Sequence, residues 1–87
     1  METTALLAER GKTHGDFNEH AHITQNLKAA MRRYDSWERL TASQMEALEM
    51  IAHKIGRILA GNPNYADHWD DIAGYAKLVA DRCQTQE

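Results

Sequence analysis

The sequence has 87 residues, of which 43% are hydrophobic and only 7% aromatic, with one proline and a formal net charge of −3. A chain this short forms one domain and buries only about 60–65% of the surface that it exposes when unfolded, so we expect it to associate as a dimer or tetramer. Lys and Arg total 10 against 13 for Asp and Glu. Because these basic residues are also scattered, an extended nucleic acid is excluded as the main partner.

The single cysteine, Cys83, excludes an internal disulfide and is consistent with a reducing cytoplasm. Its place on an apolar stripe predicts a small core residue. The first ten residues lack the pattern of a signal peptide, and no apolar run approaches the roughly 18–20 residues that a membrane span needs. We therefore expect a cytoplasmic protein without membrane contact.

The first half of the chain predicts two helices. Residues 1–10 favour a short helix closed by Gly11, whose leucines have few apolar companions. Asp16 is the expected N-cap of a second helix that ends near Tyr34. His20 lies on the apolar stripe of this helix and is expected in a core or an interface. We expect the first helix and the His20 stripe to meet another copy.

The second half predicts two longer helices. Thr41 and Gln44 form a capping box, and a wide apolar face follows from Met45 to Leu59, before Gly61-Asn62-Pro63 ends the helix. Gly56 inside this helix costs about 1 kcal/mol relative to Ala, which indicates a close helix contact. Asn64 is the expected cap of the last helix. Its predicted buried stripe comprises Trp69, Ile72, Ala73, Ala76, Val79, Ala80 and Cys83. The pattern predicts an all-α bundle of about four helices.

Carboxylates on the last two helices suggest a metal site. Glu46 and Glu49 are one turn apart, and Asp67, Asp70 and Asp71 lie in the first turns of the final helix. Hard cations such as Mg²⁺ take several oxygen ligands, so packing these helices side by side would create an acidic site able to hold the phosphates of a nucleotide. The alternative is that these side chains are ordinary solvated carboxylates, favoured at a helix N-terminus by the dipole.

Cations form a second group of candidates. Lys54 and Arg57, three residues apart, could clamp a phosphate, or they could instead be ion-pair partners of the acidic face. The histidines include no His-x₃-His pair, so zinc is not favoured.

Three blocks carry a resemblance that covers Glu9 to Asp81. They are residues 10–17 (RGKTHGDF), residues 45–59 with their KIGRI segment, and residues 67–76 (DHWDDIAGYA). Together they resemble a family of small proteins encoded by phages and prophages. That family is in turn similar in layout to the MazG-like all-α nucleoside triphosphate pyrophosphatases.

The resemblance implies a Mg²⁺-dependent helical bundle, usually dimeric or tetrameric, that cleaves a nucleotide between its α- and β-phosphates. Glu46 and Glu49 match the Glu-x-x-Glu pair of those enzymes, whereas their Glu-x-x-Asp pair is replaced here by shorter all-Asp spacing. On this basis Mg²⁺ is expected at Glu46, Glu49, Asp67, Asp70 and Asp71. Phosphate is expected at Lys54 and Arg57, and the base or sugar at His14, Asp16 and Phe17. The alternative is a non-enzymatic phage accessory protein that binds a host protein or a small signalling nucleotide.

Overall fold

The computed structural model describes residues 2–85, with side chains from 5 to 83, and it is helical throughout. Its elements are α1 (Glu2–His14), α2 (Phe17–Arg32), the short 3₁₀ helix η1 (Asp35–Arg39), α3 (Ala42–Ala60) and α4 (Ala66–Thr85). No strand occurs among the described residues. The prediction of an all-α bundle of about four helices is confirmed.

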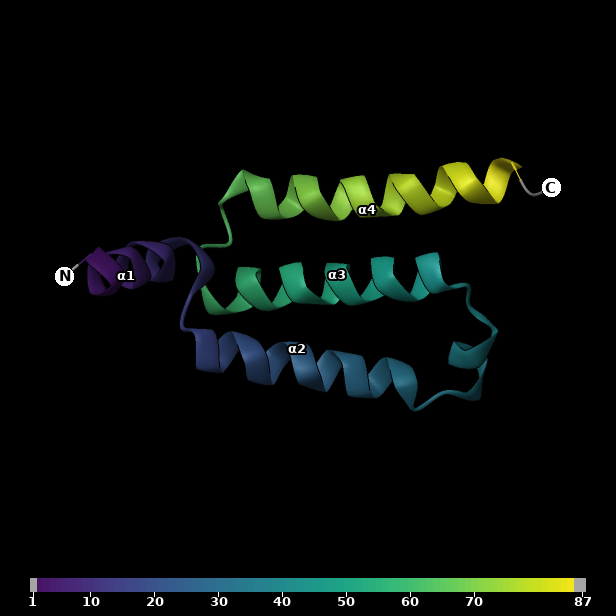
Figure 1. Cartoon of the computed structure of the whole chain (residues 1–87), viewed down its shortest axis with the longest axis horizontal. Helices are drawn as coiled ribbons and strands as arrows, with labels where there is room; N and C mark the ends of the chain where they lie inside the picture. Colours follow the sequence, from purple (N-terminus) through teal and green to yellow (C-terminus); the bar gives the residue numbers. More distant parts are fainter. Residues whose placement is uncertain (1, 86–87) are drawn as a thin grey trace.

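The three long helices form one antiparallel layer rather than a closed bundle. Figure 1 shows α3 in the middle, with α2 on one side and α4 on the other, while α1 projects from one end. The molecule measures 52 × 26 × 21 Å. Because α2 and α4 pack mainly on α3 and not on each other, α3 is the structural centre of the chain.

The predicted starts of α2 and α3 are confirmed by their caps. The Asp16 carboxylate accepts a hydrogen bond from the Glu19 backbone N–H at 3.0 Å. Thr41 and Gln44 exchange two hydrogen bonds, at 3.1 and 2.9 Å, as a capping box. These side chains satisfy N–H groups that a helix leaves without partners, so local sequence is enough to fix both starts.

Two predicted boundaries are wrong. α1 continues through Gly11 to His14 and stops at Gly15, whose φ of 82° lies in the left-handed region. Gly11 has open space around it, so nothing in its surroundings interrupts the helix there. α4 begins at Ala66, because the Asn64 backbone N–H donates to the Asn62 side chain in the preceding turn.

A close approach of α2 and α3 confirms the role predicted for Gly56. A Cβ at this position would lie 2.7 Å from Cδ2 of His20 and even closer to the Thr24 hydroxyl. His20 and Thr24 are both buried, and His20 Nε2 lies 3.2 Å from the His53 carbonyl oxygen and donates to it. His20 therefore lies in the α2–α3 core, one of the two settings expected for it, and contact of its stripe with another copy stays a prediction. Leu6 and Leu7 of α1 are exposed, as their lack of apolar companions predicted.

The apolar stripe predicted to be buried on α4 is instead open. Trp69 is 54% exposed, Ile72 and Val79 are half-buried, and Cys83 is exposed rather than a core residue. The reason is the open arrangement, in which α4 packs mainly on α3. Between residues 2 and 85, no helix is long and apolar enough to span a membrane.

Candidate functional site

Backbone packing fixes the loop between α1 and α2 against the end of α3. At Gly15 a Cβ would overlap the Ala60 carbonyl group, so only glycine fits there, both for space and for its positive φ. The Asn62 backbone N–H donates to the Thr13 carbonyl oxygen at 3.0 Å. These contacts hold the last turn of α1 and the first turn of α2 beside the C-terminal half of α3.

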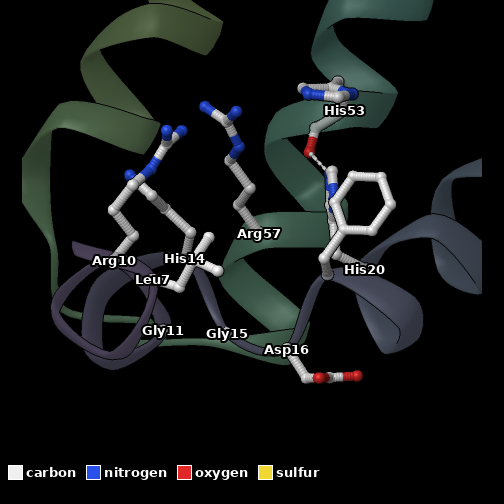
Figure 2. Close-up of a pocket in the computed structure, with 10 residues that line it drawn as sticks. Leu7, Arg10, Gly11, His14, Gly15, Asp16, His20, His53 and Arg57 are labelled. Carbon is white, nitrogen blue, oxygen red and sulfur yellow. Dashed lines mark hydrogen bonds between the residues drawn. The ribbon is translucent and has the colours of Figure 1, made fainter. Parts of the chain in front are cut away.

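A pocket of about 520 Å³ opens where these three helices meet. The residues that line it come from α1, the connecting loop, α2 and α3: Leu7, Arg10, Gly11, His14, Gly15, Asp16, Phe17, His20, His53 and Arg57. Its size lies within the roughly 300–1,000 Å³ typical of small-molecule sites. Figure 2 shows the side chains of Arg10 of α1 and Arg57 of α3 extending in the same direction, with Arg57 between Arg10 and the pair His20 and His53.

The pocket carries positive charge without a matching carboxylate. Within the described part of the chain, neither Arg10 nor Arg57 makes an ion pair. Asp16 is the one carboxylate in the lining; it caps α2, and in Figure 2 it points away from the two guanidinium groups. Arginine fits phosphate and carboxylate oxygens in a bidentate manner, so this arrangement is suited to an anion.

Histidines surround the two arginines. His14 Nδ1 lies 3.2 Å from Nε2 of His68, which is buried to 1% exposure. The second ring nitrogen of His68, Nδ1, is buried without a hydrogen-bond partner among the described residues. Burial lowers the pKa of His14, and the nearby charge of Arg57 lowers it further. Burial also lowers the pKa of His68.

His20 and His53 form a second histidine pair, with ring centroids 4.5 Å apart in an edge-to-face arrangement. Burial lowers the pKa of His53 to about 4, with His20 and Arg57 adding to the shift. Burial likewise lowers the pKa of His20. These rings are therefore neutral at neutral pH, and the positive charge of the pocket comes from its arginines.

Four of the five residues predicted to contact a nucleotide line this pocket, namely His14, Asp16, Phe17 and Arg57. Lys54 does not, since its side chain turns to the α4 side and its ammonium group lies 2.9 Å from the Asp71 carboxylate. Phe17 is 78% exposed at the rim, which leaves its ring free to stack. The structure thus places together residues that the sequence singled out from separate segments.

The five carboxylates predicted to hold Mg²⁺ do not converge within one chain. Glu49 faces α2, where it pairs with Arg32, and Asp71 pairs with Lys54. Glu46 lies at the other end of α3, in a groove beside the C-terminal half of α4. The Lys54–Asp71 pair sets the antiparallel register, so Glu46 is about 12 Å along the helix axis from that pair.

Asp67 and Asp70 are exposed in the first turns of α4, far from Glu46 for the same reason. Across residues 2–85, no group of three or more His, Cys, Asp or Glu side chains is arranged to hold a metal ion. These five carboxylates therefore form no shared acidic site among the described residues of one chain, and Mg²⁺ binding stays a prediction. Spacing along each helix does not reveal which turns of two antiparallel helices lie opposite each other.

A family model described as "Domain of unknown function (DUF6378)" matches residues 2–83, nearly the whole chain. The chain belongs to the DUF6378 family. No curated protein and no solved structure matches it. The matched region contains all the residues that line the pocket.

The sequence did not single out Arg10, the second arginine of the lining, or His68, which contacts the lining residue His14. Arg10 belongs to the RGKTHGDF block, but only the extension of α1 past Gly11 brings it beside Arg57. His68 is buried between α4 and the loop, where it contacts His14. The signal available in the sequence was Gly15, because a glycine between His14 and Asp16 indicates that the loop backbone approaches another segment closely.

Proposed function

We propose that this chain binds a small phosphorylated ligand, a nucleotide, in the pocket between α1, α2 and α3. The observation that carries the proposal is the pair of arginines, Arg10 and Arg57, that share the pocket without a carboxylate partner. The guanidinium groups would take the phosphate oxygens. The exposed ring of Phe17 at the rim offers a stacking surface for a base.

The neutral histidines support this assignment. His14 and His53 lie in the lining, and the positive charge of Arg57 opposes their protonation. A bound phosphate would reverse that field, so each ring nitrogen could then carry a proton and donate to a phosphate oxygen. Ligand binding would therefore take up protons. Sulfate is the probe for this proton uptake. It stays a dianion at mildly acidic pH, so any protons taken up when it binds go to the protein and not to the ligand.

Cleavage of the nucleotide with Mg²⁺ is the activity that the resemblance to MazG-like enzymes implies. The carboxylates of one chain do not fit a Mg²⁺ site, so they supply no hydrolytic step. In the proposal Mg²⁺ enters with the ligand, because it accompanies nucleoside triphosphates through their phosphate oxygens. Assays for phosphate and pyrophosphate release with and without Mg²⁺ extend the binding test to turnover.

The test is a titration of the chain with nucleoside triphosphates, diphosphates and inorganic pyrophosphate, followed by calorimetry and by thermal unfolding. A ligand at about 100 times its Kd adds about 2.7 kcal/mol to the free energy of unfolding, which raises the Tm by roughly 10 °C or more. Arg57→Gln should weaken binding by about 10–100-fold, the value of a charge-assisted hydrogen bond. Arg33→Gln, at the far end of α2, is the matched control and should bind as the unaltered chain does.

Phe17→Ala separates base recognition from phosphate recognition. It should weaken nucleotides by about 1–3 kcal/mol, the usual value of base stacking on an aromatic ring, and leave pyrophosphate unaffected. An absence of binding for all these ligands, or an Arg57→Gln variant that binds as tightly as the unaltered chain, overturns the proposal.

A further inference from the structure

The central helix leaves two of its sides uncovered. Gly56 and Glu49 of α3 meet α2, whereas Ala47 and Lys54 lie toward α4. At about 100° per residue these two sides of the helix are nearly opposite each other. Two faces of the three-helix layer therefore remain, one on each side of the plane seen in Figure 1.

These two faces differ in chemistry. One carries His53 and Arg57 and holds the nucleotide pocket. The other carries Leu48, Ile51, Ile55 and Leu59 along the length of α3. On α4, Leu78 and Asp81 line the groove that contains Glu46, and at about 100° per residue Trp69 and Ile72 point nearly the opposite way. We call the four residues of α3, together with Trp69 and Ile72, the apolar face.

The apolar face is open and carries no charge along α3. Leu59 is 63% exposed and Trp69 is 54% exposed, while Ile51 and Ile55 are only half-buried although they lie on the central helix. From Met45 to Leu59 every charged side chain of α3 points to another side. Soluble monomers rarely expose such a continuous apolar surface, so it needs a cover.

The whole chain exposes more surface than a compact monomer of its mass, enough to provide a dimer interface. A folded monomer of 9.9 kDa exposes about 5,200 Å² by the usual scaling with mass, whereas this chain exposes 6453 Å². The excess is about 1,250 Å² per chain. Two chains that each hid this amount would bury about 2,500 Å², which lies in the range of obligate homodimers, about 2,000–5,000 Å².

We infer that the apolar face is the interface of a homodimer, in which a second copy of this chain packs its own apolar face against it. A two-fold axis brings the same surface of both copies together, so an uncharged, self-complementary face suits it. None of the six residues of the apolar face is charged. The nucleotide pocket lies on the opposite side of α3 and remains open in this dimer.

The test compares two leucines of equal exposure on opposite faces. Leu59 of α3 is 63% exposed on the apolar face, and Leu78 of α4 is 64% exposed in the groove that also contains Glu46, on the other face. Sedimentation of the unaltered chain should give twice the mass of 9.9 kDa. Leu59→Asp should weaken the dimer by 100-fold or more, because a carboxylate would be buried at the interface in both copies. Leu78→Asp should leave the dimer unchanged.

Thermal unfolding of the unaltered chain supplies a readout that needs no variant. If folding is coupled to dimerisation, the Tm rises with protein concentration. A well-folded monomer whose Tm does not depend on concentration overturns the inference, as does a dimer that Leu59→Asp leaves intact or that Leu78→Asp disrupts. Nucleotide binding is measured separately on the same samples, so failure of the dimer and failure of the pocket are distinguishable.

Discussion

The packing of α2 on α3 can be tested with two glycines that sit in the middle of helices. Gly56 of α3 lies against His20 and Thr24, whereas Gly74 of α4 has open space around it. Replacing either glycine by alanine improves helix propensity by about 1 kcal/mol. The same substitution should therefore have opposite effects at the two positions.

At Gly74 only the helix term applies, so Gly74→Ala should add up to about 1 kcal/mol to the free energy of unfolding and raise the Tm by about 4–8 °C. At Gly56 the new methyl group would lie 2.7 Å from Cδ2 of His20 and closer still to the Thr24 hydroxyl. The two helices would have to separate, and overpacking of this kind costs about 1–3 kcal/mol. After the helix gain is subtracted, Gly56→Ala should be less stable than the unaltered chain by up to about 2 kcal/mol.

Urea and thermal denaturation followed by far-UV circular dichroism, at one fixed protein concentration, measure both effects. Adding Thr24→Ala to the Gly56→Ala variant should recover part of the loss, because it removes the atom nearest to the new methyl group. A Gly56→Ala chain at least as stable as the Gly74→Ala chain would show that α2 and α3 do not approach each other as described.

Two further predictions concern charge. Asp71→Asn should lower the free energy of unfolding by about 1–3 kcal/mol, because it leaves the buried Lys54 ammonium without its partner. Lys54→Met removes the buried charge itself and should be close to neutral. Equal losses for the two variants in urea unfolding would contradict this prediction. Acid should also destabilise the chain. The pKa of His53 is lowered by burial from 6.5 to about 4, so between these values the unfolded chain binds a proton that the folded chain excludes. The free energy of unfolding should fall by about 1–2 kcal/mol over that range, allowing for solvent screening of the half-exposed ring, and His53→Gln should reduce this fall.

Local signals in the sequence predicted the local structure well. Asp16, Thr41 and Gln44 cap helices as their positions indicate, because a cap involves only residues three or four apart. Gly56 in turn indicates a close helix contact from its position alone, since a glycine in a helix interior lowers helix stability and needs a reason. Gly11 and Gly15 show the limit of such reasoning. Either glycine could end α1 as judged from the sequence, and only the contact of Gly15 with the end of α3 decides that the helix stops there.

Features that depend on helix register were not predictable from one sequence. Glu46 and Glu49 are one turn apart as predicted, but the Lys54–Asp71 pair fixes a register that separates them from Asp67 and Asp70. The pocket was predicted in part, because Arg57 and the residues of the loop were recognised, while Arg10 was not. The stripe on α4 was predicted to be buried and is open, and its apolar character is explained if a second copy covers it.

Binding of a nucleotide in the basic pocket between α1, α2 and α3 can be located residue by residue with NMR. Backbone amide shifts of isotope-labelled chain would be recorded during titration with a nucleoside triphosphate. Shifts should be concentrated in residues 7–17 and 53–57, where the pocket lies, with little change in residues 67–71. Shifts centred on Glu46, Glu49 and the acidic start of α4, or no shifts at saturating nucleotide, would contradict binding in this pocket.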